Sequence, residues 1–378
     1  MYDYTELIHY NSRDTLNRLT TEQKERDIRA INNLLSKHGL IVTSGIESFT
    51  TIQYRVKLSP DSNLSKLLKL QPNLCIALDD DTVRLYREKS ELVIEKKGAD
   101  NTIWMGTLYT EQFDDHKGLP IMLGIDAQGN RVITDLKKMP HALVAGATGS
   151  GKSVLESVFI CSLLIKYPNM TIYGIDTKRV EFQSFRYAPN FHLVTDAAAA
   201  TQTLRDLCDE MEDRYNQLVR AKVNNIDEYN NKGGKMNPIV VIIDEFADLM
   251  LLSGKHVEEY VVRLAQKARA CGIHLIIATQ RPTKDVVTGL IKANIPTRIC
   301  LKVTSALDSR IILDRNGGET LVGKGDMLFL GNGAFEPIRI QGCYLEEVEK
   351  SNVAITARKR VEESKEKATN PFSNLFKR

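Results

Sequence analysis

The chain has 378 residues, of which 42% are hydrophobic and 26% are charged. This balance is typical of a globular protein with ample apolar material for a buried core, and the length allows two domains. The formal net charge of +3 is close to neutral for this length. Composition alone therefore does not indicate a nucleic-acid binder, and any basic surface has to be local.

Cysteine usage and the N-terminal segment bear on the compartment. The six cysteines are scattered, none forms a Cys-x-x-Cys pair, and their spacing offers no zinc cluster. The N-terminus has neither a basic start nor an apolar signal core. No window of about 18 residues is free of charge, so a membrane span is not expected. We expect a cytoplasmic protein that would reach a membrane only through a partner protein.

Residues 1–118 are predicted to form a small N-terminal α+β domain. A polar helical stretch to about residue 45 carries a broken apolar stripe that includes Leu16, Leu19 and Ile28. Residues 50–58 alternate as in a half-buried strand, and a turn cluster at 59–63 precedes a short helix over 64–70. Two further strands are expected over residues 82–86 and 91–95.

A change of pattern near residues 114–120 marks the expected domain boundary. From residue 119 to 348, short β-rich runs alternate with amphipathic helices, which favours a parallel sheet covered by helices. The expected strands are 142–145, 171–175, 239–243, 275–279 and 298–303, and the expected helices are 152–166, 197–223, 256–271 and 308–313. Residues 349–378 are predicted to be a polar basic tail, disordered or loosely helical, with Arg358, Lys359 and Arg360 as a solvated charge run.

One segment matches the pattern G-x-x-x-x-G-K-[ST] in full: Gly146, Ala147, Thr148, Gly149, Ser150, Gly151, Lys152 and Ser153. Glycines let such a loop curl so that its N–H groups point at phosphate oxygens, and the following helix adds its positive end. We expect Lys152 to bridge the β- and γ-phosphates of ATP and the hydroxyl of Ser153 to ligate Mg²⁺. The preceding apolar strand and the following apolar helix are the setting that this motif requires.

Two further strands end in polar residues that suit ATP hydrolysis. The apolar run 239–243 ends in Asp244 and Glu245, where Asp244 would hold the Mg²⁺ shell and Glu245 would polarise the attacking water. The run 275–279 ends in Gln280, which could sense the γ-phosphate or the water because parallel strands end at the same edge of a sheet. No Asn-Lys-x-Asp motif is present, so the sequence offers no residues that would select guanine nucleotides.

Longer strings carry a resemblance beyond these general motifs. They include residues 141–153, 244–250, 263–270, 278–282, 288–298 and 308–310. Over about residues 50–345 the chain resembles the FtsK/SpoIIIE family of double-stranded DNA translocases. The resemblance implies an α/β fold: a RecA-like P-loop ATPase core with a mostly parallel sheet, plus the smaller N-terminal α+β domain. It also implies a hexameric ring that moves duplex DNA through its pore, with the N-terminal domain as a second tier.

The resemblance assigns roles to several cations. Arg269 resembles the arginine finger that one subunit offers to the γ-phosphate held by its neighbour, although the residues alone would suggest a solvated helix charge. Arg281 and Lys292 fall on the first pore loop of the family and Arg310 on the second. Contacts of such cations with DNA phosphates are expected to be sensitive to salt and indifferent to sequence.

The two ends of the chain lack familiar parts of chromosomal family members. No membrane anchor or long linker precedes residue 1, and the tail after Val348 is too short for a winged-helix domain. We therefore expect the motor core only, from a phage, plasmid or other mobile element or as a core fragment. A membrane protein or a mobile-element protein stays open as a partner.

Two alternatives remain open at the level of sequence. A conjugative coupling ATPase or a phage DNA-packaging ATPase would share the same core. A nucleotide-switched DNA-binding scaffold would not need Glu245 for fast activation of water, which argues against that alternative.

Overall fold

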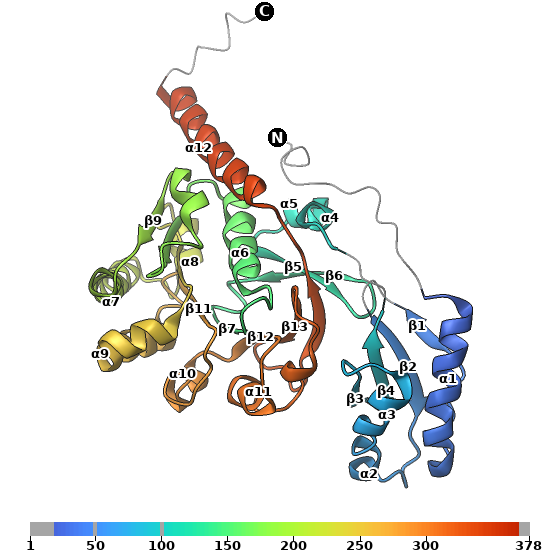
Figure 1. The fold of residues 1–378 in the computed structure, drawn as a ribbon. Coiled ribbons are helices and arrows are strands. Elements are labelled where there is room, and N and C mark those ends of the chain that lie inside the picture. Colours follow the sequence, from blue (N-terminus) through green and yellow to red (C-terminus); the bar gives the residue numbers. More distant parts are fainter. Residues whose placement is uncertain (1–18, 48–50, 99–101, 370–378) are drawn as a thin grey trace, which may run out of the picture.

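The computed structural model of the chain describes residues 19–47, 51–98 and 102–369. Two sheets are visible in Figure 1, a small one near the N-terminus (blue) and a large one built from the rest of the chain. The start of the predicted N-terminal apolar stripe, including Leu16, and residues 370–378 of the predicted tail lie outside the described residues. Among the residues described, no helix has both the length and the apolar character needed to cross a membrane.

The small sheet is antiparallel, with the strand order β1-β2-β4-β3. Helix α1 begins with a capping box in which Thr20 and Gln23 satisfy each other's backbone N–H groups. Its buried side chains Ile31 and Leu35 pack with Ile52 and Tyr54 of the sheet. The elements are α1 (Thr21–Leu35), β1 (Gly45–Glu47), β2 (Thr51–Lys57), α2 (Leu64–Leu68), α3 (Gln71–Leu78), β3 (Arg84–Glu88) and β4 (Glu91–Lys97).

The large sheet has ten strands in the described part of the chain, in the order β6-β5-β14-β13-β12-β7-β11-β10-β8-β9. The run from β12 to β9 is parallel, and the other strands join it as antiparallel neighbours. The strands are β5 (Pro120–Asp126), β6 (Arg131–Asp135), β7 (His141–Ala145), β8 (Thr171–Ile175), β9 (Phe191–Val194), β10 (Ile239–Ile243), β11 (Ile273–Thr279), β12 (Thr297–Leu301), β13 (Asp326–Leu330) and β14 (Ile338–Gly342).

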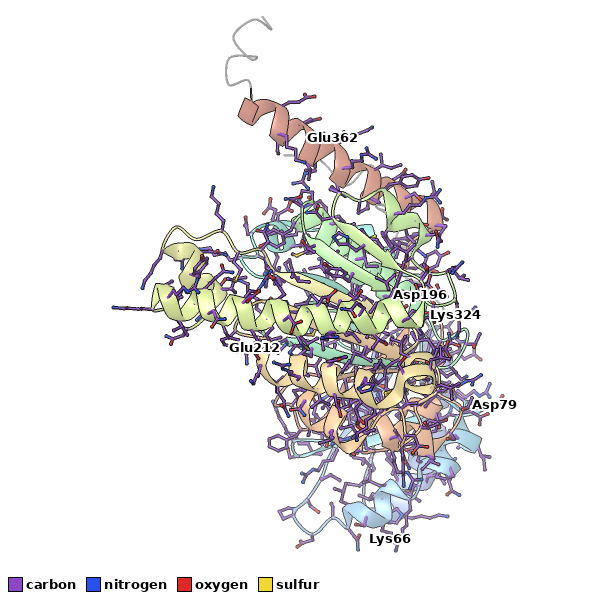
Figure 2. All side chains as sticks on the ribbon, turned by 90° about the vertical axis from the view of Figure 1, so that its left-hand side faces the viewer. Lys66, Asp79, Asp196, Glu212, Lys324 and Glu362 are labelled. Atoms are coloured by element: carbon purple, nitrogen blue, oxygen red, sulfur yellow. The ribbon has the colours of Figure 1, made fainter. Side chains whose placement is uncertain are left out.

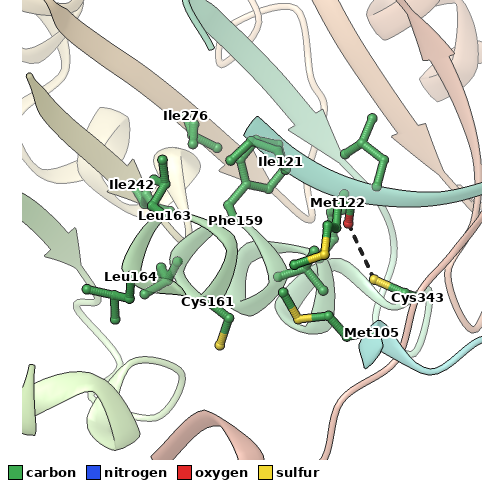
Figure 3. Packing of buried hydrophobic residues seen from close by; sticks show 14 of the residues in the cluster. Met105, Ile121, Met122, Phe159, Cys161, Leu163, Leu164, Ile242, Ile276 and Cys343 are labelled. Atoms are coloured by element: carbon green, nitrogen blue, oxygen red, sulfur yellow. Dashed lines mark hydrogen bonds between the residues drawn. The ribbon is translucent and has the colours of Figure 1, made fainter. Parts of the chain in front are cut away.

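Helices cover both faces of the large sheet, so the domain has three layers. One core contains α6 (Lys152–Lys166) and α12 (Glu347–Thr369), and Figure 3 shows α6 packed beneath the strands. The opposite core contains α7 (Ala197–Ala221) and α9 (Phe246–Lys267). In Figure 2, α7 crosses the molecule from its N-cap residue Asp196 past Glu212. The shorter helices are α4 (Met105–Leu108), α5 (Glu111–Asp114), α8 (Ile226–Asn231), α10 (Gly289–Asn294) and α11 (Ala306–Leu313).

The segment that connects the two sheets, described over residues 102–119, packs with the large sheet. Ile103, Met105, Leu108 and Phe113 are buried in the same core as α6, ahead of the boundary predicted at residue 118. Figure 3 shows Met105 beside Met122 and Cys343. The division of the chain at residue 118 stays a prediction.

A buried ion network joins the two sheets. The guanidinium group of Arg339 on β14 lies 2.7 Å from Asp326 and 3.1 Å from Glu95 of the small sheet. Arg84 also pairs with Glu95 at 3.1 Å. Burial opposes ionisation of Glu95, but Arg84 and Arg339 outweigh it and hold the pKa of this carboxyl below its usual range. The pair of Arg339 with Glu95 therefore anchors the small sheet to β14, which lies between β5 and β13 in the large sheet.

Several elements match their predicted ranges, and others differ, most of all α9 and α12. Helix α9 begins at Phe246, ten residues before the predicted start, because Glu245 caps it by accepting from the N–H of Ala247. It ends at Lys267, so Arg269 lies in the turn before β11 and not on a helix. In the predicted tail, residues 347–369 form one helix whose Val353, Ala354 and Ala357 are buried in the core with α6.

Candidate nucleotide site

The strand order places the predicted site residues at one edge of the large sheet. Strand β11 lies between β7 and β10, and all three are parallel. The loop after β7, the acidic pair after β10 and Gln280 after β11 therefore meet at the carboxyl edge, where open α/β sheets bind ligands. The N–H of Gly146 donates to the carbonyl of Thr279 at 3.2 Å, which ties the loop to the end of β11.

The loop from Gly146 to Ser153 has the backbone that anion binding requires. Gly149 and Gly151 adopt φ values of 77° and 101°, which glycine alone reaches without strain. A Cβ atom on Gly151 would lie 2.5 Å from the backbone nitrogen of Gly325. Helix α6 begins at Lys152, so its positive end faces the loop. The hydroxyl of Ser150 is buried without a hydrogen-bond partner, which fits a site built to receive a polar ligand.

Lys152 is buried and forms ion pairs with two carboxyl groups. Its Nζ atom lies 2.5 Å from Oδ1 of Asp244 and 3.0 Å from Oε1 of Glu156, one helical turn further along α6. Burial disfavours the charged ammonium group, but Glu156 and Asp244 outweigh burial and raise its pKa. Burial raises the pKa of Glu156 well above its usual value, against the attraction of Lys152. Lys152 therefore has to exchange carboxylate partners for phosphate oxygens if it is to bridge a triphosphate.

Glu245 is fixed by the end of β11. Its carboxylate accepts a hydrogen bond of 2.6 Å from the hydroxyl of Thr279 and one of 3.0 Å from the N–H of Gln280. The amide oxygen of Gln280 accepts in turn from the hydroxyl of Thr148 in the phosphate loop at 3.0 Å. The predicted general base, the predicted sensor and the loop are thus linked in one hydrogen-bonded chain.

A second loop, residues 322–326, packs against the phosphate loop and was not among the predicted site residues. The N–H of Gly325 donates to the carbonyl of Ser150 at 2.8 Å, and that of Lys324 to Gly149 at 3.4 Å. Gly323, Lys324 and Gly325 all have positive φ values, and Lys324 is exposed (labelled in Figure 2). The Gly-x-Gly spacing was the sequence signal for this tight turn.

A cavity of about 770 Å³ opens along the two loops. Its volume lies in the range of small-molecule and cofactor pockets. The lining comes from the phosphate loop and the start of α6, the loop 322–326 with the following Met327, β14 and the residues after it, the connecting segment, and Thr51 and Lys97 of the small sheet. Gln280, Glu181 and Leu301 also line the cavity.

Comparisons with known proteins agree with this geometry. The FtsK/SpoIIIE family model matches residues 107–284. Over 373 residues the chain is 40% identical to the DNA translocase FtsK of Haemophilus influenzae, which covers 89% of this chain and 70% of that relative. The chain belongs to the FtsK/SpoIIIE family.

Another relative and one solved structure show how far the similarity extends. The chain is 42% identical over 313 residues to the DNA translocase SftA of Bacillus subtilis, but it spans only 33% of that relative's length. A solved structure, the pCW3 conjugation coupling protein TcpA in its monomer form with ATPγS, has a TM-score of 0.63 at 25% identity. The likeness covers 90% of this chain and 99% of TcpA. The predicted P-loop ATPase fold with an additional N-terminal sheet is confirmed.

Arg269 lies far from the site described above. It is exposed in the turn that precedes β11, whereas Gln280 follows the other end of the same strand. A strand of seven residues spans roughly 20 Å, so Arg269 cannot reach the phosphate loop of its own chain. It lines a separate cavity of about 510 Å³ with Asn224 and Lys267.

The three predicted DNA-binding cations differ in their surroundings. Arg281 and Arg310 are exposed, and the Nε atom of Arg310 donates to the carbonyl of Ala306 in its own helix. Lys292 lies 2.5 Å from Asp314, which also pairs with Arg298 at 2.5 Å. These two cations lower the pKa of Asp314 despite its partial burial. The charge of Lys292 is thus largely compensated within the chain, which the sequence did not indicate.

The predicted magnesium ligands flank Lys152. Asp244 is buried against it, and Ser153 follows it at the start of α6. Among the described residues, no group of three or more His, Cys, Asp or Glu side chains could hold a metal ion. A hydroxyl and a carboxylate beside a phosphate cradle fit Mg²⁺, which typically takes one or two protein ligands together with substrate phosphates and water.

Proposed function

We propose that this protein is an ATP-driven motor that moves double-stranded DNA through the pore of a ring, most simply a homohexamer. The observation that carries the proposal is the convergence of the phosphate loop, the Asp244–Glu245 pair and Gln280 at one sheet edge. The membership of the FtsK/SpoIIIE family supports the DNA-moving role, because relatives of this chain are named DNA translocases.

ATP would bind with its phosphates on residues 146–153, where backbone N–H groups and the start of α6 face the anion. Lys152 would leave its carboxyl partners and contact the β- and γ-phosphates. Ser153 and Asp244 would hold Mg²⁺, which supplies charge stabilisation on the phosphate oxygens. Water adds to the γ-phosphorus while its bond to the β,γ-bridging oxygen breaks. Glu245 would accept a proton from that water, and Gln280 would position the water.

The position of Arg269 supports the ring. A cation at the amino edge of the sheet can stabilise a γ-phosphate only on another subunit, because its own loop lies at the opposite edge. The cavity beside Arg269 would receive the nucleotide edge of the neighbour. In this arrangement residues 119–348 form the motor ring, to which the buried side of α12 belongs, and residues 1–118 form the second tier.

Contacts with DNA would come from Arg281, Lys292 and Arg310. The three cations follow β11 or lie on α10 and α11. Guanidinium and ammonium groups bind backbone phosphates without reading bases, which suits a motor that has to pass any sequence.

The test is triplex displacement on linear duplex DNA with ATP and Mg²⁺. We expect displacement by the full chain and none by Lys152→Ala, in which the phosphate contact is lost. ATP hydrolysis that DNA does not stimulate, together with no displacement, would contradict the motor and favour a nucleotide-switched scaffold. Electron microscopy with an ATP analogue and duplex DNA would show whether a six-fold ring surrounds the DNA.

A second candidate is a coupling ATPase that delivers DNA to a conjugation pore. The likeness to TcpA, which covers 99% of that chain, favours this candidate over DNA packaging into a capsid. Neighbouring relaxase and secretion genes would support coupling, whereas capsid genes would support packaging.

A further inference from the structure

The segment that connects the two sheets runs beside the exit of β14. Trp104 and Tyr344 form an isolated parallel β-bridge. The N–H of Tyr344 donates to the carbonyl of Ile103 at 2.7 Å, and the N–H of Met105 donates to that of Tyr344 at 2.9 Å. Ile103 and Met105 are buried in the core, so the intervening Trp104 points the other way.

This bridge places two aromatic rings together in the wall of the nucleotide cavity. The rings of Trp104 and Tyr344 meet edge to face, with centroids 5.4 Å apart. Both residues line the same cavity as the phosphate loop, and Tyr344 keeps 42% of its surface exposed. Apolar side chains lie in the same wall, including Val154, Leu155 and Val322. The cavity thus combines a polar, cationic part that suits phosphates with an aromatic part that phosphates do not need.

We propose that Trp104 and Tyr344 form the site for the base of the nucleotide whose phosphates occupy residues 146–153. The proposal rests on the proposed ATP site and adds the residues that hold the base. A purine offers a flat apolar face, and aromatic side chains bind such faces by stacking. Because Trp104 belongs to the connecting segment, a bound nucleotide would touch both the motor core and the link to the small sheet.

The edge-to-face geometry supports this assignment. At an interplanar angle of 68° Trp104 covers at most one face of the Tyr344 ring, and Tyr344 is 42% exposed, so a base can stack on its other face. Stacking is largely indifferent to the identity of the base, which agrees with the lack of a guanine reader in the sequence.

The chain itself provides the probe, because Trp104 is its only tryptophan. We would titrate the full chain with ATP, ADP and inorganic tripolyphosphate in the presence of Mg²⁺ and record tryptophan emission. Calorimetry on the same samples reports binding independently. ATP and ADP should change the emission to a plateau. Tripolyphosphate should bind and reverse the ATP-induced change by competition, without a change of its own.

Two variants separate the base from the phosphates. Tyr344→Ala should weaken ATP binding roughly 5- to 100-fold, as expected for the loss of one stacking partner, and leave tripolyphosphate binding unchanged. Its backbone hydrogen bonds to Ile103 and Met105 are retained. Tyr187→Ala is the matched control, since Tyr187 is similarly exposed at 40% and lies outside the cavity. Lys152→Ala should weaken the binding of both ATP and tripolyphosphate.

The outcomes distinguish this inference from the proposed function. If calorimetry detects ATP but the emission of Trp104 does not change, or changes equally with tripolyphosphate, the base site is wrong and the ATP site stands. Equal loss of ATP and tripolyphosphate in Tyr344→Ala would also overturn it. If ATP does not bind the full chain at all, both proposals fail.

Discussion

Oε1 of Glu156 lies 3.0 Å from Nζ of Lys152, and both side chains are buried. The carboxyl group therefore provides an oxygen acceptor at the base of the phosphate loop. Glu156→Gln keeps an oxygen at this place, and we expect the free energy of unfolding to change by less than about 1 kcal/mol. Glu156→Ala removes the acceptor and leaves a cavity, with an expected loss of about 2–4 kcal/mol. Urea unfolding of both variants checks this, and equal losses would contradict it.

Thr279 is a positioning residue for Glu245. Its hydroxyl donates a hydrogen bond of 2.6 Å to the carboxylate proposed to activate water. Thr279→Val keeps the shape of the side chain and removes this bond, so kcat for ATP should fall about tenfold while KM changes little. Thr279→Ser keeps the hydroxyl and should retain most of the activity. A loss in the serine variant as large as in the valine variant would show that packing and not the hydrogen bond matters.

Arg269 and the phosphate loop lie at opposite edges of the large sheet, so they are expected to act at the same nucleotide only across subunits. Lys152→Ala and Arg269→Ala should each be nearly inactive, since a finger in trans is worth about 10³–10⁵ in rate. In a random mixture of the two variants, roughly a quarter of the ring interfaces combine an intact loop with an intact Arg269. Recovery of ATPase activity on mixing is the expected result. A mixture as inactive as its components would exclude the trans arrangement.

Asp314 compensates Lys292 and Arg298 at once. Asp314 has a positive φ of 60°, a conformation that asparagine tolerates, so Asp314→Asn should fold normally. The variant frees two cations. We expect tighter DNA binding and a dependence of log K on log salt that is steeper by about one to two. Lys292→Ala should reduce this slope by about one. Unchanged slopes in both variants would place Lys292 outside the DNA-binding surface.

Two buried histidines, His141 and His274, should make the free energy of unfolding depend on pH. Burial, with charge from His274 and Arg269, lowers the pKa of His141 to about 3. Burial lowers the pKa of His274 to about 4, partly opposed by its contact with the carbonyl of Pro140. Below the unfolded value near 6.5 the unfolded chain binds more protons than the folded chain, so stability falls as the pH drops from about 7 towards 4.

A variant isolates the contribution of His141. The Nδ1 atom of His141 accepts from the N–H of Leu275, and the side-chain oxygen of His141→Asn can take that place. Between pH 7 and pH 5 the variant should lose about 2 kcal/mol less stability than the parent protein. Melting temperatures across this range check the prediction, and parallel pH profiles would contradict it.

Local sequence predicted the centre of the large sheet well. The strands 171–175 and 239–243 and the helix 152–166 have the predicted bounds, because strands covered on both faces read as unbroken apolar runs. The antiparallel strands β13 and β14 were missed, since polar residues such as Asp326 and Arg339 lie in them. These side chains are buried only because they pair with each other and with Glu95. No local pattern reveals such a pairing.

In the candidate site, too, local sequence predicted the residues but not the contacts between distant parts of the chain. The phosphate-loop motif identified residues 146–153, and the polar ends of two apolar runs identified Asp244, Glu245 and Gln280. The strand order brings them together. The partners of Lys152 and Lys292 could not be predicted, because Asp244 and Asp314 lie 92 and 22 residues away in the chain. The start of α9 was misplaced because Ser253 and Gly254, just before the predicted start, have low helix propensity. The helix tolerates Gly254 since a Cβ there would meet open space.

The ion network around Arg339 bears on how this protein can be divided for experiments. A fragment that begins after the connecting segment would lose Glu95, leaving a buried guanidinium group with one carboxylate partner in place of two. It would also lose Thr51 and Lys97 from the wall of the nucleotide cavity. The same guanidinium group holds Asp326, which closes the loop 322–326 by accepting from the N–H of Val322 at 2.8 Å. The small sheet is therefore a structural component of the ATPase, and removing it would alter the enzyme that the fragment was meant to isolate.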